Sequence, residues 1–224
     1  MIKSNEMEIL QMTQVMIVGA HGAMAQLLTD RLLAETTDTL TLFLRDAGRL
    51  NRYATNDRVT LVDGDIKDTA AVAKAMADAD IVYSNLGGPD LAEQTQSVLT
   101  AMHQTGKQRL VYISALGAHH EVPGKFGDWN EQAIAAFLPG FRKTAQLVAD
   151  SGVTYTEIRP AWLTDHDEID YEETQLGEAF KGTEVSRKSV ADFALKVITQ
   201  PETYRNASVG LDKAGTEGDQ PSWI

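Results

Sequence analysis

The segment from Gly19 to Ala25 places small residues at a fixed spacing, directly after the apolar run Val15–Val18. Gly19 permits a tight turn, Gly22 lets the backbone approach a pyrophosphate, and Ala25 takes a third position where close packing limits side-chain size. A helix beginning here would direct free N–H groups and its positive dipole end at phosphates. The pattern predicts a dinucleotide site, with a purely structural turn as the alternative. The loop residues predicted to hold the cofactor are Gly19, Ala20, His21, Gly22, Ala23 and Met24.

The next apolar run, Leu40–Leu44, ends in a charged turn that could select between the two nicotinamide dinucleotides. Arg45 comes first and Asp46 second, and Arg49 and Arg52 follow. A guanidinium can bind the 2′-phosphate of NADP through paired hydrogen bonds, whereas an acidic residue here would bind the ribose hydroxyls of NAD. The sequence therefore favours NADP(H) over NAD(H). The alternatives are a solvated turn, or an Asp46 side chain that turns inward to bind NAD.

Asp65 and Ile66 follow the third apolar run, Val59–Val62. The Ile66 side chain could flank an adenine ring while the Asp65 carboxylate accepts a hydrogen bond from the adenine amino group. The alternative is that Asp63 or Asp65 caps the next helix, since aspartate is a preferred N-cap residue, and Asp68 is the stronger cap candidate. The two roles are compatible, so we predict that Asp65 and Ile66 belong to the cofactor site.

Two further apolar runs, Ile81–Ser84 and Leu110–Ile113, end in residues that could reach the same crevice. In an open parallel sheet, ligands bind at the carboxyl ends of the strands. The residues that follow the first of these runs are Asn85, Leu86 and Gly87. Glycine there allows close approach of a ligand but could equally serve a tight turn. Ser114 ends the second run and could hydrogen-bond a substrate or cap the next turn.

Apolar runs alternate with longer amphipathic segments along most of the chain. The expected helices are 24–33, 69–77, 91–105, 141–151 and 189–199, the last with Ser189 as N-cap, and the later strands are 153–158 and 208–211. This alternation predicts βαβ units and an α/β fold, a doubly wound parallel sheet in a single domain. We expect residues 1–12 to be an N-terminal extension and 13–224 to form the domain, with a small C-terminal substrate-side portion.

The composition excludes several classes of protein. The 224 residues carry a net charge of −12, which disfavours binding to nucleic acid or anionic lipid. There is no cysteine, so disulfides and thiolate chemistry are excluded, and a reducing cytoplasm fits. No apolar stretch approaches the roughly 18 residues of a membrane span, and no leader segment is visible. We expect a cytoplasmic monomer or homodimer acting on a small molecule.

Several motifs together resemble one family. They are Gly19-x-x-Gly22-x-x-Ala25, Arg45-Asp46, Gly64-Asp65 with Asp68, Ser114-x-x-Gly117, Lys143 and the segment Ser151–Pro160. From about Thr13 to Leu211 the chain resembles the atypical short-chain dehydrogenases. More narrowly, it resembles the NmrA-like and flavin/biliverdin-reductase-like NAD(P)-binding proteins, often described as NAD-dependent epimerase/dehydratase-like. The resemblance implies an NAD(P)-binding Rossmann fold. It also implies that Pro160 and Trp162 line the nicotinamide side and that Lys143 contacts the ribose.

One departure from the family pattern bears on the chemistry. Carbonyl-reducing short-chain dehydrogenases use a Tyr four residues before the Lys as acid/base. Here Lys143 is preceded at that spacing by Pro139, and the nearby Phe137 and Phe141 cannot transfer a proton. Hydride transfer to a flavin, quinone or enone needs less from the protein, because the cofactor supplies most of the chemistry. Ser114 and Lys143 remain the catalytic candidates, with an exposed helical charge as the alternative for Lys143.

Two function hypotheses follow. The first is an oxidoreductase that passes hydride from NADPH to a small planar acceptor. The second is a non-catalytic, NAD(P)-sensing regulator of the NmrA-like type, which the missing Tyr favours. A sugar-nucleotide epimerase or dehydratase is a third possibility, but the missing Tyr and the short C-terminal part count against it.

Two polar segments have less specific patterns. His119-His120-Glu121 lacks a third metal ligand at useful spacing, so we expect a substrate loop or solvated loop and no metal site. The acidic segment 165–173 contains no basic residue and lacks the staggered spacing of a calcium loop. It is expected to be a solvated loop at the mouth of the site, with a lid that excludes anions as a further hypothesis.

Overall fold

Most strands join a single sheet. The structure, a computed structural model, describes residues 12–224. The strands of the main sheet are β1 (Gln14–Val18), β2 (Thr39–Leu44), β3 (Val59–Asp63), β4 (Ile81–Ser84), β5 (Arg109–Ile113), β6 (Thr154–Pro160), β8 (Glu172–Gln175) and β10 (Ala207–Asp212). Their order is β3-β2-β1-β4-β5-β6-β10-β8, and every neighbouring pair is parallel except β10 and β8. The predicted doubly wound parallel sheet is confirmed, with an antiparallel strand added at one edge.

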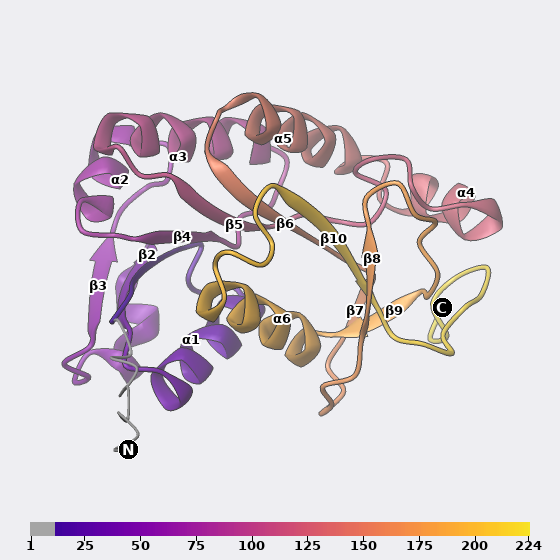
Figure 1. The fold of residues 1–224 in the computed structure, drawn as a ribbon, viewed down its shortest axis with the longest axis horizontal. Coiled ribbons are helices and arrows are strands. Elements are labelled where there is room, and N and C mark those ends of the chain that lie inside the picture. Colours follow the sequence, from indigo (N-terminus) through magenta and orange to yellow (C-terminus); the bar gives the residue numbers. More distant parts are fainter. Residues whose placement is uncertain (1–11) are drawn as a thin grey trace, which may run out of the picture.

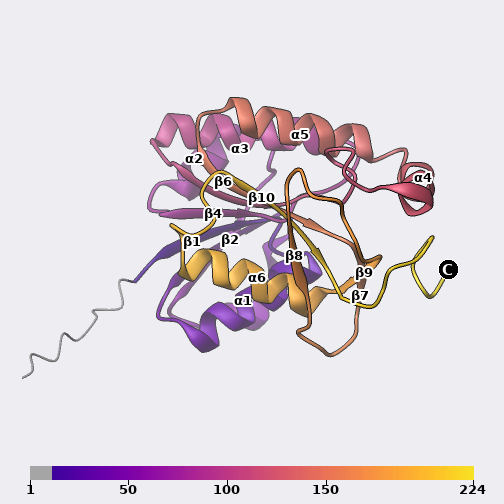
Figure 2. The ribbon, with the colours of Figure 1, turned by 45° about the vertical axis from the view of Figure 1, so that its right-hand side comes forward.

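Helices cover both faces of this sheet (Figure 1). They are α1 (Ala23–Glu35), α2 (Thr69–Met76), α3 (Leu91–Thr105), α4 (Gly124–Ala133), α5 (Leu138–Asp150), α6 (Arg187–Thr199) and the 3-10 helix η1 (Ala47–Tyr53). Figure 2 shows α1 and α6 on one face and α2, α3 and α5 on the other, which is the three-layer arrangement of a Rossmann fold. A second sheet pairs β7 (Trp162–Thr164) with β9 (Glu184–Ser186) in parallel.

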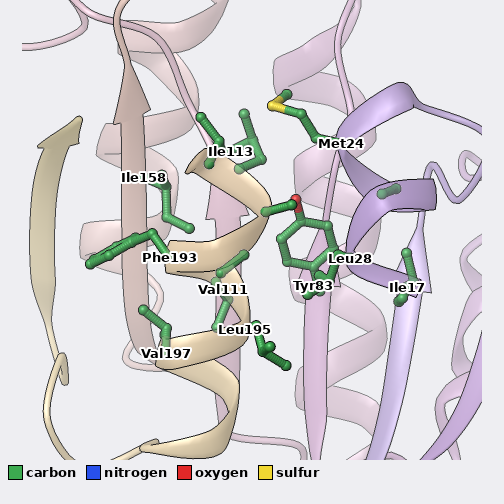
Figure 3. Close-up of a cluster of buried hydrophobic side chains, with 14 of the residues drawn as sticks. Ile17, Met24, Leu28, Tyr83, Val111, Ile113, Ile158, Phe193, Leu195 and Val197 are labelled. Atoms are coloured by element: carbon green, nitrogen blue, oxygen red, sulfur yellow. The ribbon is translucent and has the colours of Figure 1, made fainter. Parts of the chain in front are cut away.

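The alternation of side chains along β1 shows why the sheet is buried on both faces. Val15 and Ile17 join the cluster under α1 and α6, while Met16 and Val18 join the cluster on the opposite face. In Figure 3, the first cluster brings side chains of four neighbouring strands against those of α1 and α6. These include Ile17, Tyr83, Val111, Ile158, Leu28 and Phe193, all fully buried. This packing fixes α1 against the sheet and therefore fixes the position of its N-terminus.

The structure departs from the sequence prediction at helix boundaries. Ser189 is not the N-cap of the last helix, which begins at Arg187 with Ser186 as its cap. Ser186 has extended backbone angles, and its Oγ accepts a hydrogen bond of 2.9 Å from the N–H of Ser189. Ser189 is thus the capped residue. The predicted helix 141–151 begins three residues earlier, at Leu138, and neither α4 nor η1 was predicted.

Most of the predicted N-terminal extension, residues 1–12, lies outside the described residues. Among residues 12–224, no helix combines the length and apolar character needed to cross a bilayer.

The Ser186 cap yields a stability prediction. Ser186→Ala removes the acceptor for an N–H of the first turn of α6 and should lower the free energy of unfolding by about 1–2 kcal/mol. Urea denaturation followed by circular dichroism measures this difference. The exposed Ser222 provides a matched Ser→Ala control, which should change stability by less than about 0.5 kcal/mol. Equal effects of the two substitutions would contradict the assignment of the cap.

Candidate functional site

The loops after β1 and β4 meet where the strand order reverses. Gly19 has a φ of 71°, and a Cβ atom there would lie 2.6 Å from the carbonyl oxygen of Asn85. A Cβ atom at Gly22 would lie 1.9 Å from Nδ2 of Asn85. The backbone contact and the positive φ allow only glycine at position 19, whereas a side chain at position 22 would displace the Asn85 amide. Sequence patterns predicted the two glycines, and the fold gives the reason: the two loops touch.

The N-terminus of α1 opens toward this crevice. Its N-cap is Gly22, which provides no side-chain acceptor, and the first turn contains no acidic residue. The first N–H groups and the positive end of the helix dipole therefore remain available to an anion. The Gln26 side chain donates a 2.8 Å hydrogen bond to the carbonyl of His21 and holds the loop in place.

A cavity of about 490 Å³ extends from this helix terminus to the ends of β2 and β3. A volume of this size is typical of small-molecule sites. Eight of the predicted cofactor residues line it: Gly19, His21, Gly22, Arg45, Asp65, Ile66, Leu86 and Gly87. Five glycines, a helix N-terminus and two arginines are among the groups around this space, which is the chemistry of a phosphate and adenosine site.

The turn after β2 directs its arginines at the cavity. Arg45 and Arg49 both line it, and Arg49 also contacts the ring of His21. Asp46 is exposed with a left-handed backbone, φ 56°. The Asp63 carboxylate accepts hydrogen bonds from the N–H groups of Asp46 at 3.3 Å and Ala47 at 2.9 Å. Asp63 thus anchors this turn, and the cap of α2 is Asp68, as the sequence favoured.

A second cavity, of about 670 Å³, lies on the other side of the β4 loop. Leu86 and Gly87 line both cavities, so one extended ligand could occupy the two together. The predicted residues that line the second cavity are Met24, Asn85, Leu86, Gly87, Ser114, Pro160 and Trp162. Lining residues that the sequence did not assign to the site include Ile134, Phe137, Phe141, Arg187 and Trp223. Aromatic and aliphatic side chains thus dominate this space.

Ser114 and Trp162 are fixed on the wall of the second cavity. The N–H of Ser114 donates to the carbonyl of Ile158 at 2.7 Å, and the residue is only 3% exposed. Its Oγ is buried, and a hydrogen bond from it helps to lower the pKa of the Glu157 carboxyl. Nε1 of Trp162 donates to Oδ1 of the buried Asn130 at 3.0 Å, and its ring lies 4.8 Å from that of Trp129.

Three predicted residues do not line either cavity. Ala20 is fully buried beneath the glycine loop, and Ala23 is exposed as the first residue of α1. Lys143 is exposed on α5, outside both cavities, which matches its alternative role as a helical surface charge. Its neighbour Thr144 is the residue that turns inward, toward Thr95 at 3.4 Å.

The segment 119–121 is not a solvated or mobile loop, and that expectation is corrected. His119 Nε2 lies 2.6 Å from Oε2 of Glu157, and Oε1 of Glu121 accepts a 2.6 Å hydrogen bond from Nη1 of Arg159. Glu157 and Arg159 are two residues apart on β6, so both point to the same side and both are buried. Buried charges need partners, and this turn supplies them. Ser208 completes the network by donating to Glu157 at 2.6 Å.

The network shifts the pKa values of His119 and Glu157 in opposite directions. The hydrogen bond to Glu157 raises the pKa of His119 above its ordinary value, against the effect of burial. Burial would raise the pKa of Glu157, but the hydrogen bond and charge of His119 lower it overall. The two groups therefore form an ion pair directly behind the strand end that leads to Pro160.

Ion pairs tie the acidic segment 165–173 to later parts of the chain, although its composition predicts a solvated loop. Asp165 and Asp167 are exposed, as expected for a solvated loop, but the segment's acids pair with cations from later in the chain. These pairs are Arg187–Asp165, Lys188–Asp167, Lys213–Glu168 and Lys196–Glu173. Residues 172–175 form β8 and are not loop. Among residues 12–224, no three His, Asp or Glu side chains gather as a metal site would require.

The chain belongs to the NAD(P)H-binding family, whose sequence pattern matches residues 19–201. The resemblance to atypical short-chain dehydrogenases is thereby confirmed, as is the NAD(P)-binding Rossmann fold. No match was found among curated proteins.

Solved structures agree with this assignment. A short-chain dehydrogenase/reductase from Veillonella parvula in complex with NADP is 26% identical, covers 94% of this chain and 99% of its own, and gives a TM-score of 0.87. A Rossmann-fold NAD(P)-binding family protein from Shigella flexneri is 37% identical over 95% of this chain and 100% of its own, with a TM-score of 0.80. An anaerobillin reductase from Escherichia coli, 22% identical over 92% and 100% with a TM-score of 0.75, shares the fold.

The His119–Glu157 pair predicts a pH-dependent stability. Folding raises the pKa of His119, so this residue contributes its full stabilisation below pH 6.5, and the contribution is lost as the pH rises through the pKa of His119 in the folded protein. Folding lowers the pKa of Glu157, so this residue contributes its full stabilisation above pH 4.5, and the contribution is lost as the pH falls through the pKa of Glu157 in the folded protein. The pair therefore stabilises the fold most between pH 4.5 and pH 6.5. His119→Gln should cost about 1 kcal/mol more at pH 6 than at pH 9 in urea denaturation.

His120→Gln is the matched control, because the neighbouring His120 ring is largely exposed. A pH dependence of the same size in both variants would contradict the role given to the buried pair.

Proposed function

We propose that this protein is an oxidoreductase that transfers hydride from NADPH to a small planar acceptor held in the second cavity. The observation that carries the proposal is the junction of the two cavities at Leu86 and Gly87. One cavity offers a helix N-terminus and arginines to phosphates, and the other offers aromatic walls to a ring. The Veillonella parvula short-chain dehydrogenase/reductase, 26% identical, is in complex with NADP, which supports the choice of cofactor.

The residues present fit a bound dinucleotide. Gly19 and Gly22 line the first cavity beside the N-terminus of α1, and neither adds a side chain to that space. Arg45 and Arg49 line the first cavity, while the exposed Asp46 does not. A pair of guanidinium groups is suited to a 2′-phosphate, so we assign the preference for NADP(H) over NAD(H) to them.

The second cavity suits an acceptor that needs little proton chemistry from the protein. The dinucleotide, when bound, would supply the hydride. Trp162 and Phe141 would exclude water and pack against a planar ring, and the Ser114 hydroxyl would hydrogen-bond a carbonyl oxygen or ring nitrogen. Pro139 occupies the position of the acid/base Tyr, which favours a flavin, quinone or enone over an unactivated ketone.

A non-catalytic NAD(P) sensor is the second candidate. Two observations favour it: Pro139 stands where the Tyr of the family would be, and Lys143 is exposed away from both cavities. A sensor would bind the dinucleotide at the same site but would not reduce an acceptor in the second cavity.

Cofactor preference is tested by calorimetric titration with NADPH, NADP, NADH and NAD. Arg45→Ala and Arg49→Ala should each weaken NADPH binding roughly tenfold and leave NADH binding within about twofold, because only NADPH carries the 2′-phosphate. Arg52→Ala is the control, since Arg52 belongs to the same turn but does not line the cavity. Equal losses for NADPH and NADH would contradict the assignment.

Turnover separates the enzyme from the sensor. NADPH oxidation, followed at 340 nm with flavin, quinone and enone acceptors, should be measurable for the wild type. In Ser114→Ala, kcat should fall roughly tenfold with the best acceptor, as expected for the loss of one hydrogen bond that forms in the transition state. Tight dinucleotide binding without turnover of any acceptor would favour the sensor.

A further inference from the structure

Arg187 is the one charged side chain among the residues that line the second cavity. The remaining walls are aliphatic or aromatic apart from Ser114 and Asn85. Arg187 reaches this position because β9 pairs in parallel with β7 and because α6 begins directly after β9. The register sets Thr164 opposite Ser186, so Arg187, which follows β9, lies beside the end of β7, the strand that carries Trp162.

Two features leave this guanidinium poorly compensated. Arg187 is the first residue of α6, where the positive end of the helix dipole disfavours a cation. Its carboxylate partner is Asp165, with Nη1 2.7 Å from Oδ1, and the Asp165 side chain is 87% exposed. Exposed ion pairs contribute little net stability, so a ligand anion could exchange with Asp165 at small cost.

Arg187 therefore gives the second cavity one cation on largely apolar walls. The whole chain carries a net charge of −12, which repels anions at long range. A local cation in the cavity is thus the feature by which an anionic acceptor would be retained.

We propose that the acceptor is a planar conjugated carboxylate, and that Arg187 binds its carboxylate group in place of Asp165. The conjugated ring packs against the aromatic wall that includes Trp162. This inference rests on the proposed function, because it specifies the substrate class of the same cavity. It also gives the acidic segment a role opposite to that of a repulsive lid: Asp165 competes for the cation and does not simply exclude anions.

The test compares a neutral naphthoquinone with the same ring bearing a carboxylate, each reduced with NADPH. In Arg187→Ala, KM for the carboxylated quinone should rise about tenfold or more, as expected for the loss of a charge-assisted hydrogen bond, and KM for the neutral quinone should change less than about twofold. Asp165→Asn should have the opposite effect and lower KM for the carboxylated quinone, because it removes the competing anion.

Lys188→Ala is the matched control. Lys188 is the next residue of α6 and pairs with Asp167, but it does not line the cavity. It should leave the ratio of the two KM values unchanged. Equal changes for both quinones in Arg187→Ala, or the same ratio in the Arg187 and Lys188 variants, would overturn the inference.

A binding measurement keeps the inference separate from the proposed function. Trp162 and Trp223 line the cavity, so quenching of tryptophan fluorescence by either quinone reports binding without turnover. If neither quinone is reduced, the proposed function fails. Tighter binding of the carboxylated ring, lost in Arg187→Ala, would still support the carboxylate site. Equal affinity for both rings would overturn it.

Discussion

The contact between the loops after β1 and β4 is the constraint on which the site depends. The Asn85 carbonyl leaves no space for a Cβ atom at Gly19, and a Cβ atom at Gly22 would displace the Asn85 side chain. No side chain caps the N-terminus of α1, and no acidic residue in the first turn offsets the helix dipole. The same β4 loop separates the two cavities and contributes Leu86 and Gly87 to both. In the proposed function, the loop at the end of β4 therefore positions both the cofactor and the acceptor.

Charged residues near the cavities fall into two groups: those paired with one another and those that line the cavities. Behind β6, the buried Glu157 and Arg159 are paired with His119 and Glu121, which leaves no net charge next to the acceptor cavity. Most acidic residues of the segment 165–173 are likewise paired, with lysines and arginines. Arg45, Arg49 and Lys67 line the first cavity together with Asp65 and Asp90, and Arg187 lines the second, although the chain as a whole is strongly acidic. Local charge thus favours ligands that the overall charge repels.

Sequence patterns predicted the sheet and the glycine loop, and 13 of the 16 predicted site residues line the two cavities, because most of them lie within a few positions of a strand end. They missed Arg187, which lines the second cavity through the β7–β9 pairing, and Asn130, which holds Trp162 through a hydrogen bond. They also misjudged the 119–121 turn, whose partners on β6 lie 38 residues further along the chain. Local spacing cannot reveal such partners, since the tertiary fold brings them together.

The central claim is that one dinucleotide spans both cavities, with its nicotinamide beside Ser114 and Trp162. A crystal structure of the protein soaked with NADP tests it most directly. The account predicts the pyrophosphate at the N-terminus of α1, the 2′-phosphate between Arg45 and Arg49, and the nicotinamide in the second cavity. A nicotinamide turned into solvent, or a dinucleotide confined to another surface, would contradict it.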